Sequence, residues 1–186
     1  ATFEAFLGLL GFAIATGLFY GRFSRPRAYL KFSETAVVAP FEEGSAIMFR
    51  VASYKNNMLS EAEVNITAAI EENIDGKLVS KFYQIEPTLK KINSFSLNWT
   101  LVHKIDSNSP FYGFSEDDFK NTDIELIIMI KAFDEVFANT VVQRTSYITP
   151  EIVYGARFLP MYHSSEDNKT TILDLDKIDD YQVVKI

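Results

Sequence analysis

The chain has 186 residues, 47% of them hydrophobic, with 18 Lys and Arg against 25 Asp and Glu, so its formal net charge is -7. This much apolar material can form a sizeable core, which argues against disorder, and the acidic average argues against a nucleic-acid binder. The lack of cysteine excludes disulfides and thiolate metal sites, and two histidines exclude a multi-histidine centre. No metal and no cofactor are therefore predicted.

The charges are distributed unevenly along the chain. The first 31 residues hold four bases and a single acid, Glu4, which leaves 14 bases and 24 acids in the remainder. The four bases are Arg22, Arg25, Arg27 and Lys31. This separation indicates that the two parts of the chain occupy different environments.

An uncharged run of 17 residues extends from Ala5 to Gly21. As a helix it would be about 25 Å long, slightly short of a bilayer's hydrocarbon core of roughly 30 Å. A secretory signal peptide has its bases before the apolar run, whereas here the arginines follow it. We therefore predict one transmembrane helix within residues 1–25, with its basic end on the cytoplasmic side; a buried core helix is the alternative.

Three residues of this helix, Phe12, Thr16 and Tyr20, recur at every fourth position and therefore share one face. In a single helix such a stripe would contact lipid, and in a symmetric bundle it could line a pore. Pro26 is expected to end the helix, because the residue before a proline is driven away from helical geometry.

Beyond Pro26 the apolar pattern changes to the alternation of β-strands. The predicted strands are residues 28–33, 47–54, 62–70, 77–85, 95–102, 124–133 and 140–148. A short helix with a Ser cap is predicted at residues 115–119. Strands at this density, with little helix, predict a mainly β domain over residues 26–186, folded as an antiparallel β-sandwich.

Motifs for catalysis are nearly absent from the sequence. It contains no glycine-rich phosphate loop and no G-x-S-x-G elbow, and its acidic runs lack the spacing of a calcium loop. His103 lies close to Asp106 in sequence and could be half of a hydrolytic pair, but a structural histidine is the preferred interpretation. The chain is therefore not expected to be an enzyme.

Several long segments together resemble the prokaryotic branch of the inward-rectifier potassium channels. They are GRFSRPRAYLKFS, FEEGSAIMFRVASYKNNMLSEAEVNI, FSLNWTLVHKIDSNSPFYG, QRTSYITPEIVYGARF and ILDLDKID. They occur in the family's order and cover almost the whole chain. The resemblance implies a pore-lining inner helix at residues 1–25 and an immunoglobulin-like cytoplasmic β-sandwich at residues 26–186. It also implies a voltage-gated-class channel in the cell inner membrane, a homotetramer with most of this chain in the cytoplasm.

The resemblance implies roles for residues near the membrane. Tyr20 matches the constriction at the cytoplasmic end of the inner helices, with Thr16 and Phe12 deeper in the pore. Phe12 falls where strongly rectifying relatives carry an acid that attracts polyamines, which argues against strong polyamine block. Anionic phosphoinositide headgroups are expected at the basic positions. These positions are Arg22, Arg25, Arg27 and, as a less secure neighbour, Lys31.

Further roles are implied for the cytoplasmic pore, where potassium is the permeant ion and polyamine or Mg²⁺ would be additional ligands. Glu61 matches an acidic pore-wall position. Lys131 stands where many relatives have Glu, and would oppose cation attraction unless it pairs with Asp134 or Glu135. The loop that narrows this pore is expected at residues 132–140. Its candidate residues are Ala132, Phe133, Asp134, Val136, Phe137 and Ala138.

The 186 residues contain no Gly-Tyr-Gly filter sequence and no candidate for an outer helix, a pore helix or a slide helix. Because filter carbonyls confer potassium selectivity, this chain alone is not expected to select potassium. The patterning by itself leaves open a membrane-tethered β-sandwich that binds a protein or small ligand without conducting ions. A hydrolase that uses His103 and Asp106 is a third reading.

Overall fold

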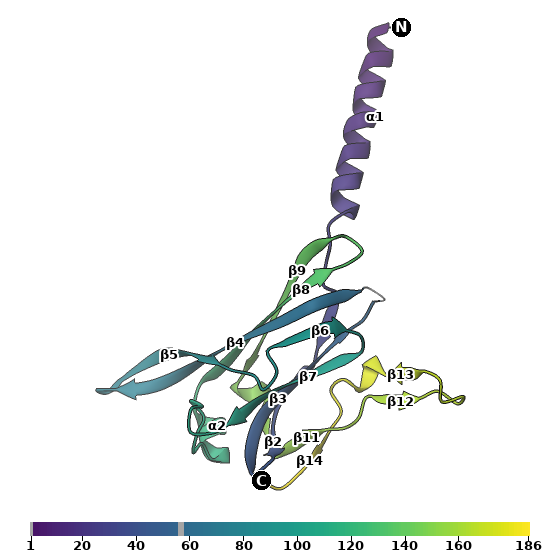
Figure 1. Cartoon of the computed structure of the whole chain (residues 1–186). Coiled ribbons are helices and arrows are strands. Elements are labelled where there is room, and N and C mark those ends of the chain that lie inside the picture. Colours follow the sequence, from purple (N-terminus) through teal and green to yellow (C-terminus); the bar gives the residue numbers. More distant parts are fainter. Residues whose placement is uncertain (1, 56–57) are drawn as a thin grey trace.

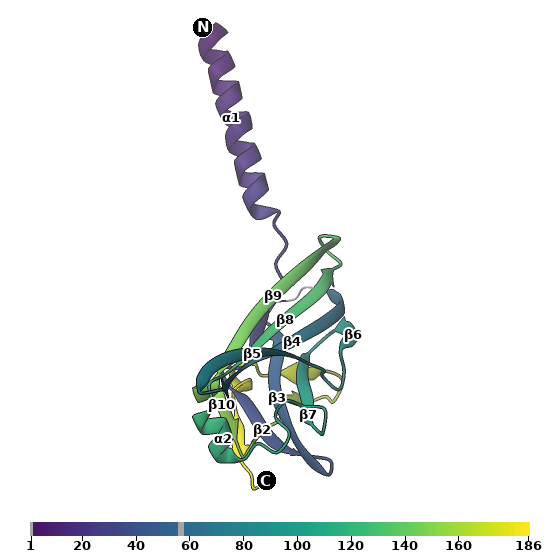
Figure 2. The same ribbon diagram turned by 90° about the vertical axis from the view of Figure 1, so that its left-hand side faces the viewer.

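The computed structural model describes residues 2–55 and 58–186, so the first residue of the predicted inner-helix segment lies outside it. Helix α1, Thr2–Phe23, projects from one end of a β-domain (Figures 1 and 2). None of its residues is buried against the domain, which disfavours the alternative of a core helix. It is long and apolar enough to cross a membrane by length and composition, and it ends before Pro26 as predicted.

The first sheet contains five strands in which β3 is central. Its strands are β1 Leu30–Phe32, β2 Ala36–Phe41, β3 Gly44–Ser53, β7 Asn98–Ile105 and β10 Ile152–Tyr154. Strand β3 pairs with β1, β2 and β7, each in antiparallel register. Strand β10 joins β2 in parallel, although 110 or more residues separate them, so the sheet is not purely antiparallel.

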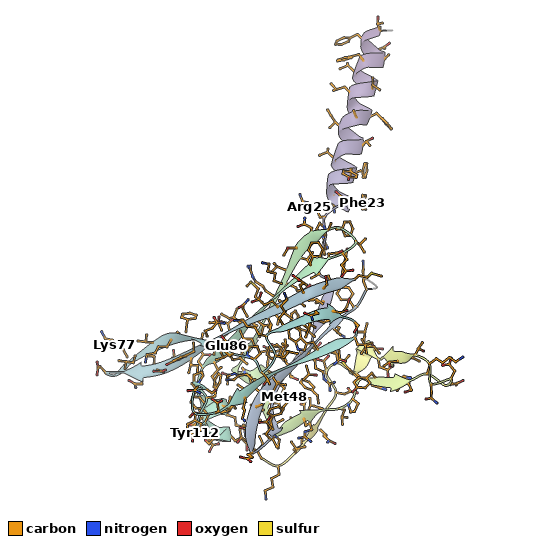
Figure 3. The ribbon with its side chains drawn as sticks, in the orientation of Figure 1. Phe23, Arg25, Met48, Lys77, Glu86 and Tyr112 are labelled. Atoms are coloured by element: carbon orange, nitrogen blue, oxygen red, sulfur yellow. The ribbon has the colours of Figure 1, made fainter. Side chains whose placement is uncertain are left out.

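The second sheet also contains five strands, and all of its pairs are antiparallel. Its strands are β4 Leu59–Ile74, β5 Lys77–Ile85, β6 Lys91–Phe95, β8 Ile124–Asp134 and β9 Asn139–Ile148. The ends of β4 and β5 extend beyond the sandwich as a hairpin whose tip carries Lys77 (Figure 3). At the opposite end, the turn between β8 and β9 lies closest to α1 (Figures 1 and 2).

One core cluster joins the two sheets, because alternate residues of β3, β4 and β8 point inward. Val64, Ile66 and Ala68 of β4 are fully buried, and Phe49 of β3 packs on Tyr147 of β9 with 5.5 Å between ring centroids. Buried side chains of both sheets thus form the interior of a sandwich. This confirms the prediction of a mainly β sandwich that follows one apolar helix.

The C-terminal part of the chain covers the outer face of the first sheet. It contains two small strand pairs and two short 3-10 helices, at Thr149–Glu151 and Leu175–Lys177. The strand pairs are β11 Ala156–Phe158 with β14 Tyr181–Val183, and β12 Tyr162–Ser164 with β13 Thr171–Leu173. Met161 and Ile178 pack on Ala52 of β3, so this segment forms a partial third layer.

The remaining helix, α2, spans Glu116–Asn121 and begins as the sequence predicts. Ser115 is its N-cap, and the Asp118 backbone N–H donates to the Ser115 hydroxyl. The Asp118 carboxylate accepts in return from the Ser115 backbone N–H at 2.7 Å. This reciprocal pair is a capping box, which explains why so short a helix has a defined start.

Candidate functional site

The stripe of Phe12, Thr16 and Tyr20 lies on the exposed surface of α1. The Phe12 and Tyr20 side chains are 71% and 75% exposed, and the Thr16 hydroxyl donates to the Phe12 carbonyl at 2.8 Å. Because this hydroxyl is satisfied within the helix, the stripe presents mainly two aromatic rings. They are free to contact lipid or other copies of the helix.

The arginines lie at the junction between α1 and β1, where Arg25 is seen beside Phe23 (Figure 3). Arg22, Arg25 and Arg27 are all exposed, and no acid in the described part of the chain lies within ion-pair distance of them. Three cations therefore face solvent immediately after an apolar helix.

Lys31 differs from these arginines because it belongs to the sandwich itself. It lies in β1, is half-buried, and its Nζ donates to the Leu175 carbonyl of the C-terminal segment at 3.5 Å. The structure thus brings three of the four predicted bases together and gives the fourth a partner within the domain.

The two predicted pore-wall residues lie on the second sheet. Glu61 has a positive φ of 49° at an irregularity of β4 between Ser60 and Glu63, and its Oε2 lies 3.5 Å from Lys91 Nζ. Such a bulge redirects a side chain relative to the regular alternation of the strand. Lys131 is exposed on β8, directly opposite Glu63 of β4 in register.

Among the contacts of the described residues, Lys131 forms no ion pair with Asp134 or Glu135. The pairing that would neutralise its charge, as considered from the sequence, is therefore not found there. The Asp134 side chain is 1% exposed and its Oδ1 accepts from the backbone N–H groups of Val136 and Phe137. Asp134 is therefore committed to the turn. The cross-strand neighbour Glu63, which sequence reasoning did not single out, is the acid placed opposite the lysine.

The predicted constriction loop coincides with the turn from β8 to β9. The side chains at its tip are exposed, with 68% for Val136 and 47% for Phe137, and Phe133 beside it is 39% exposed. Ala132 is instead buried in the core. Ala138 has a φ of 48°, in the left-handed region that this turn requires.

His103 and Asp106 do not form the pair considered from the sequence. The His103 Nδ1–H donates to the Glu86 carbonyl at 2.8 Å, and Nε2 accepts from the Ser109 hydroxyl at 2.8 Å. Asp106 accepts from the Asn108 backbone N–H instead. Both ring nitrogens of this buried histidine are thus satisfied by a neighbouring loop and turn, as a structural histidine requires.

His103 is expected to make stability depend on pH, because burial lowers its pKa in the folded state. The unfolded chain then binds the proton more tightly, so stability is full above about pH 6.5 and falls as the pH drops through that value. The free energy of unfolding is expected to change with pH by at most about 1.4 kcal/mol per pH unit as a result of this group. Urea unfolding of the wild type and of His103→Gln between pH 8 and 5 checks this; equal slopes in the two proteins would contradict it.

Among the residues that the structure describes, no three His, Asp or Glu side chains gather in a way that could hold a metal ion. A cavity of about 430 Å³ beside His103 is lined mainly by the turn that carries Ser109 and the loop that carries Glu86. The site residues predicted from the sequence thus lie along α1, at the arginine junction and on the second sheet.

Comparisons with known proteins identify the family of the chain. Residues 30–186 match the family described as the inward rectifier potassium channel C-terminal domain. The chain is 33% identical over 177 residues to the inward rectifier potassium channel Kirbac3.1 of Paramagnetospirillum magnetotacticum, covering 95% of this chain and 60% of the relative. It is 25% identical over 182 residues to the inward rectifier potassium channel irk-1 of Caenorhabditis elegans, covering 93% and 34%.

The solved structure of the sporulation control protein Spo0M of Bacillus subtilis matches 67% of this chain and 49% of the Spo0M chain, with a TM-score of 0.32 and 9% sequence identity. This similarity is too low to support a conclusion about fold or function. The chain spans 60% or less of the length of the two curated relatives. The match to the C-terminal domain nevertheless extends over most of the chain. The chain therefore belongs to the inward-rectifier potassium channel family, a family of channels and not of enzymes, and contains its cytoplasmic domain.

Proposed function

We propose that this chain is the inner-helix and cytoplasmic part of an inward-rectifier potassium channel subunit, acting as the gate and the cytoplasmic vestibule for potassium. The observation that carries the proposal is the match of residues 30–186 to the channel's C-terminal domain directly after an exposed apolar helix. On this proposal α1 spans the cell inner membrane and the sandwich lies in the cytoplasm.

Four copies would surround the ion path, with Phe12, Thr16 and Tyr20 facing the axis. The exposure of α1 supports this, because an apolar helix that is not buried against its own domain needs lipid and other helices around it. The Tyr20 rings, one turn from the cytoplasmic end of α1, would form the narrowest point. Motion of the sandwich, transmitted through residues 24–29, would widen or close that ring.

Anionic phosphoinositide would bind at Arg22, Arg25 and Arg27. Their exposure supports this proposal, as does the lack of acid partners within the described part of the chain, because each base near an anionic leaflet contributes about 1 kcal/mol. Lys31 would contribute less to the lipid, since its ammonium group donates to the Leu175 carbonyl.

Within the vestibule, Glu61 would attract potassium, polyamine or Mg²⁺, and Lys131 would oppose this attraction. The pairing of Glu61 with Lys91 and the place of Lys131 opposite Glu63 both favour a wall of mixed charge. Together with the phenyl ring of Phe12, this supports weak block by polyamines.

The gate is tested by Tyr20→Ala in the complete channel reconstituted into liposomes. Removal of the ring is expected to raise basal potassium flux several-fold, because a hydrophobic constriction restricts ions by excluding water. Phe19→Ala is the matched control, since Phe19 is also an exposed aromatic of α1, 64% exposed, but lies on a different face. Equal flux through the two variants would contradict a gate at Tyr20.

The oligomeric state tests the assembly independently of flux. In mild detergent we expect a fourfold particle with an axial opening. A monomer or a twofold dimer would contradict the channel proposal and favour the membrane-tethered binding module.

A further inference from the structure

The turn between β8 and β9 is built around the carboxylate of Asp134. Its Oδ1 accepts from the Val136 backbone N–H at 2.9 Å and from the Phe137 backbone N–H at 3.1 Å. Asp134 is also the last residue of β8 and is paired in register with Asn139, the first residue of β9. One side chain on the rigid sheet thus bonds directly to the two residues at the tip of the turn.

Among the residues that the structure describes, few other contacts hold this tip. Val136 and Phe137 are exposed, so burial against this chain does not fix their positions. Ala138 has a left-handed φ, a backbone conformation that is unfavourable for alanine, so the chain does not adopt this turn by local preference. The Glu135 backbone N–H donates to the Met58 carbonyl at 3.0 Å, which ties only the start of the turn. Within residues 2–55 and 58–186, the hydrogen bonds to Asp134 are therefore the main local restraint on the two apolar residues.

The Asp134 carboxylate is buried and accepts hydrogen bonds within the turn, so it does not face the solvent through which ions would pass. Its side chain is 1% exposed, whereas the neighbouring Glu135 is exposed to solvent. Hydrogen bonds from N–H groups to a carboxylate are among the stronger ones in proteins. A buried acid at this position is thus suited to hold a loop in one shape.

We propose that Asp134 is the positioning residue of the cytoplasmic constriction, which fixes where Val136 and Phe137 stand and therefore how wide the opening is. The second half of this statement depends on the proposed function, because it takes this turn as the narrow part of the ion path. The first half concerns the turn alone and can be tested without ion flux.

The turn is tested by hydrogen exchange on the full chain in detergent. Asp134→Ala removes the acceptor and is expected to accelerate exchange of the amides at residues 136 and 137 about tenfold or more. Asp134→Asn keeps an oxygen acceptor at the same place and is expected to restore much of the protection. Glu135→Gln, which changes a neighbouring charge without touching these bonds, is expected to leave it unchanged.

Peptides from β3 and β7 report whether a variant is damaged throughout. If Asp134→Ala accelerates exchange there as much as in the turn, or if exchange in the turn does not change, the positioning role is overturned. If the alanine variant fails to fold, Asp134→Asn decides the matter. Exchange accelerated at residues 136 and 137 alone supports the positioning role, because a neutral amide oxygen accepts more weakly than a carboxylate, and exchange accelerated equally in β3 and β7 overturns it.

The consequence for conduction is measured as flux through the complete channel that carries Asp134→Asn or Asp134→Ala, with the wild-type channel alongside. Flux that departs from the wild type in step with the acceleration of exchange, more in Asp134→Ala than in Asp134→Asn, supports both halves of the proposal. Accelerated exchange without any change in flux overturns the constriction and leaves the positioning role of Asp134 in the turn standing.

Discussion

Replacement of Arg22, Arg25 and Arg27 by glutamine together is expected to weaken the affinity of the complete channel for a soluble short-chain phosphoinositide about 100-fold. Each base is worth about 1 kcal/mol near an anionic headgroup, so three contribute about 3 kcal/mol, and each 1.4 kcal/mol is a factor of ten. The arginines have no acid partners among the described residues that would compete with the lipid. Titration of the detergent-solubilised channel gives the dissociation constants.

The matched control changes the same charge far from the helix. Lys77, Lys169 and Lys185 are exposed bases of the domain, and Lys77 lies at the tip of the β4–β5 hairpin (Figure 3). Neutralising these three should leave the affinity nearly unchanged, and the difference between the two triple variants should shrink at high salt. A similar loss of affinity in both would show that net charge, and not the junction, attracts the lipid.

Arg50→Ala is expected to lower the free energy of unfolding by about 2 to 4 kcal/mol and to release the C-terminal segment. The Arg50 side chain points to the outer face of the first sheet, where its guanidinium lies 4.5 Å from the centroid of the Phe158 ring. Its two Nη groups donate to the carbonyls of Leu159 and Lys177. Burial lowers the pKa of Arg50, and the nearby Asp180 opposes that effect.

Urea unfolding together with limited proteolysis measures this effect, since residues 159–180 should be cleaved first in the variant. Arg157→Ala is the control, because Arg157 also donates to a carbonyl, that of Pro40 at 3.1 Å, but from an exposed position. We expect it to cost no more than about 0.5 kcal/mol. If the two variants unfold at the same urea concentration, Arg50 does not anchor the segment.

The elements that could be predicted from the sequence are those with a strong period and clear ends. Strand β5 spans Lys77–Ile85, as predicted, because Asp75 and Gly76 adopt the positive φ values of a tight turn before it. Strand β8 was found within one residue, since alternate side chains are buried along its whole length. The capped helix α2 was located by Ser115.

Other elements depend on partners that local sequence does not reveal. The predicted strand at residues 95–102 is in fact two strands, because the chain leaves β6 after Phe95 and enters β7 at Asn98 without a glycine or proline to mark the change. Strand β2 was missed, since its Pro40 argues against a strand. Two of the short strands after residue 150 depend on the first sheet, because β10 pairs with β2, and Ala156 and Phe158 of β11 pack on Val37 of β2.

The candidate residues divide in the same way. The shared face of the helical stripe follows from its spacing and the group of arginines from the charge distribution, whereas their roles at a pore and at lipid are what the family resemblance implies. The burial of Asp134 does not follow from the sequence, because an acid beside Glu135 in a turn is expected to face solvent. Its neighbours supply the reason: the carboxylate satisfies two backbone donors that the tight turn leaves without strand partners. The two bonds of His103 likewise come from residues 17 and 6 positions away in the chain.

The parallel pairing of β10 with β2 sets an order for biosynthesis. Ile152 must reach Ala36, and the outer face of the same sheet is covered by residues near 160 and 178. Such distant pairings form slowly, because the long intervening loop has to close first. During translation α1 therefore emerges long before the domain attached to it can close, and a ribosome stalled before residue 150 would leave the first sheet without one strand and without its cover.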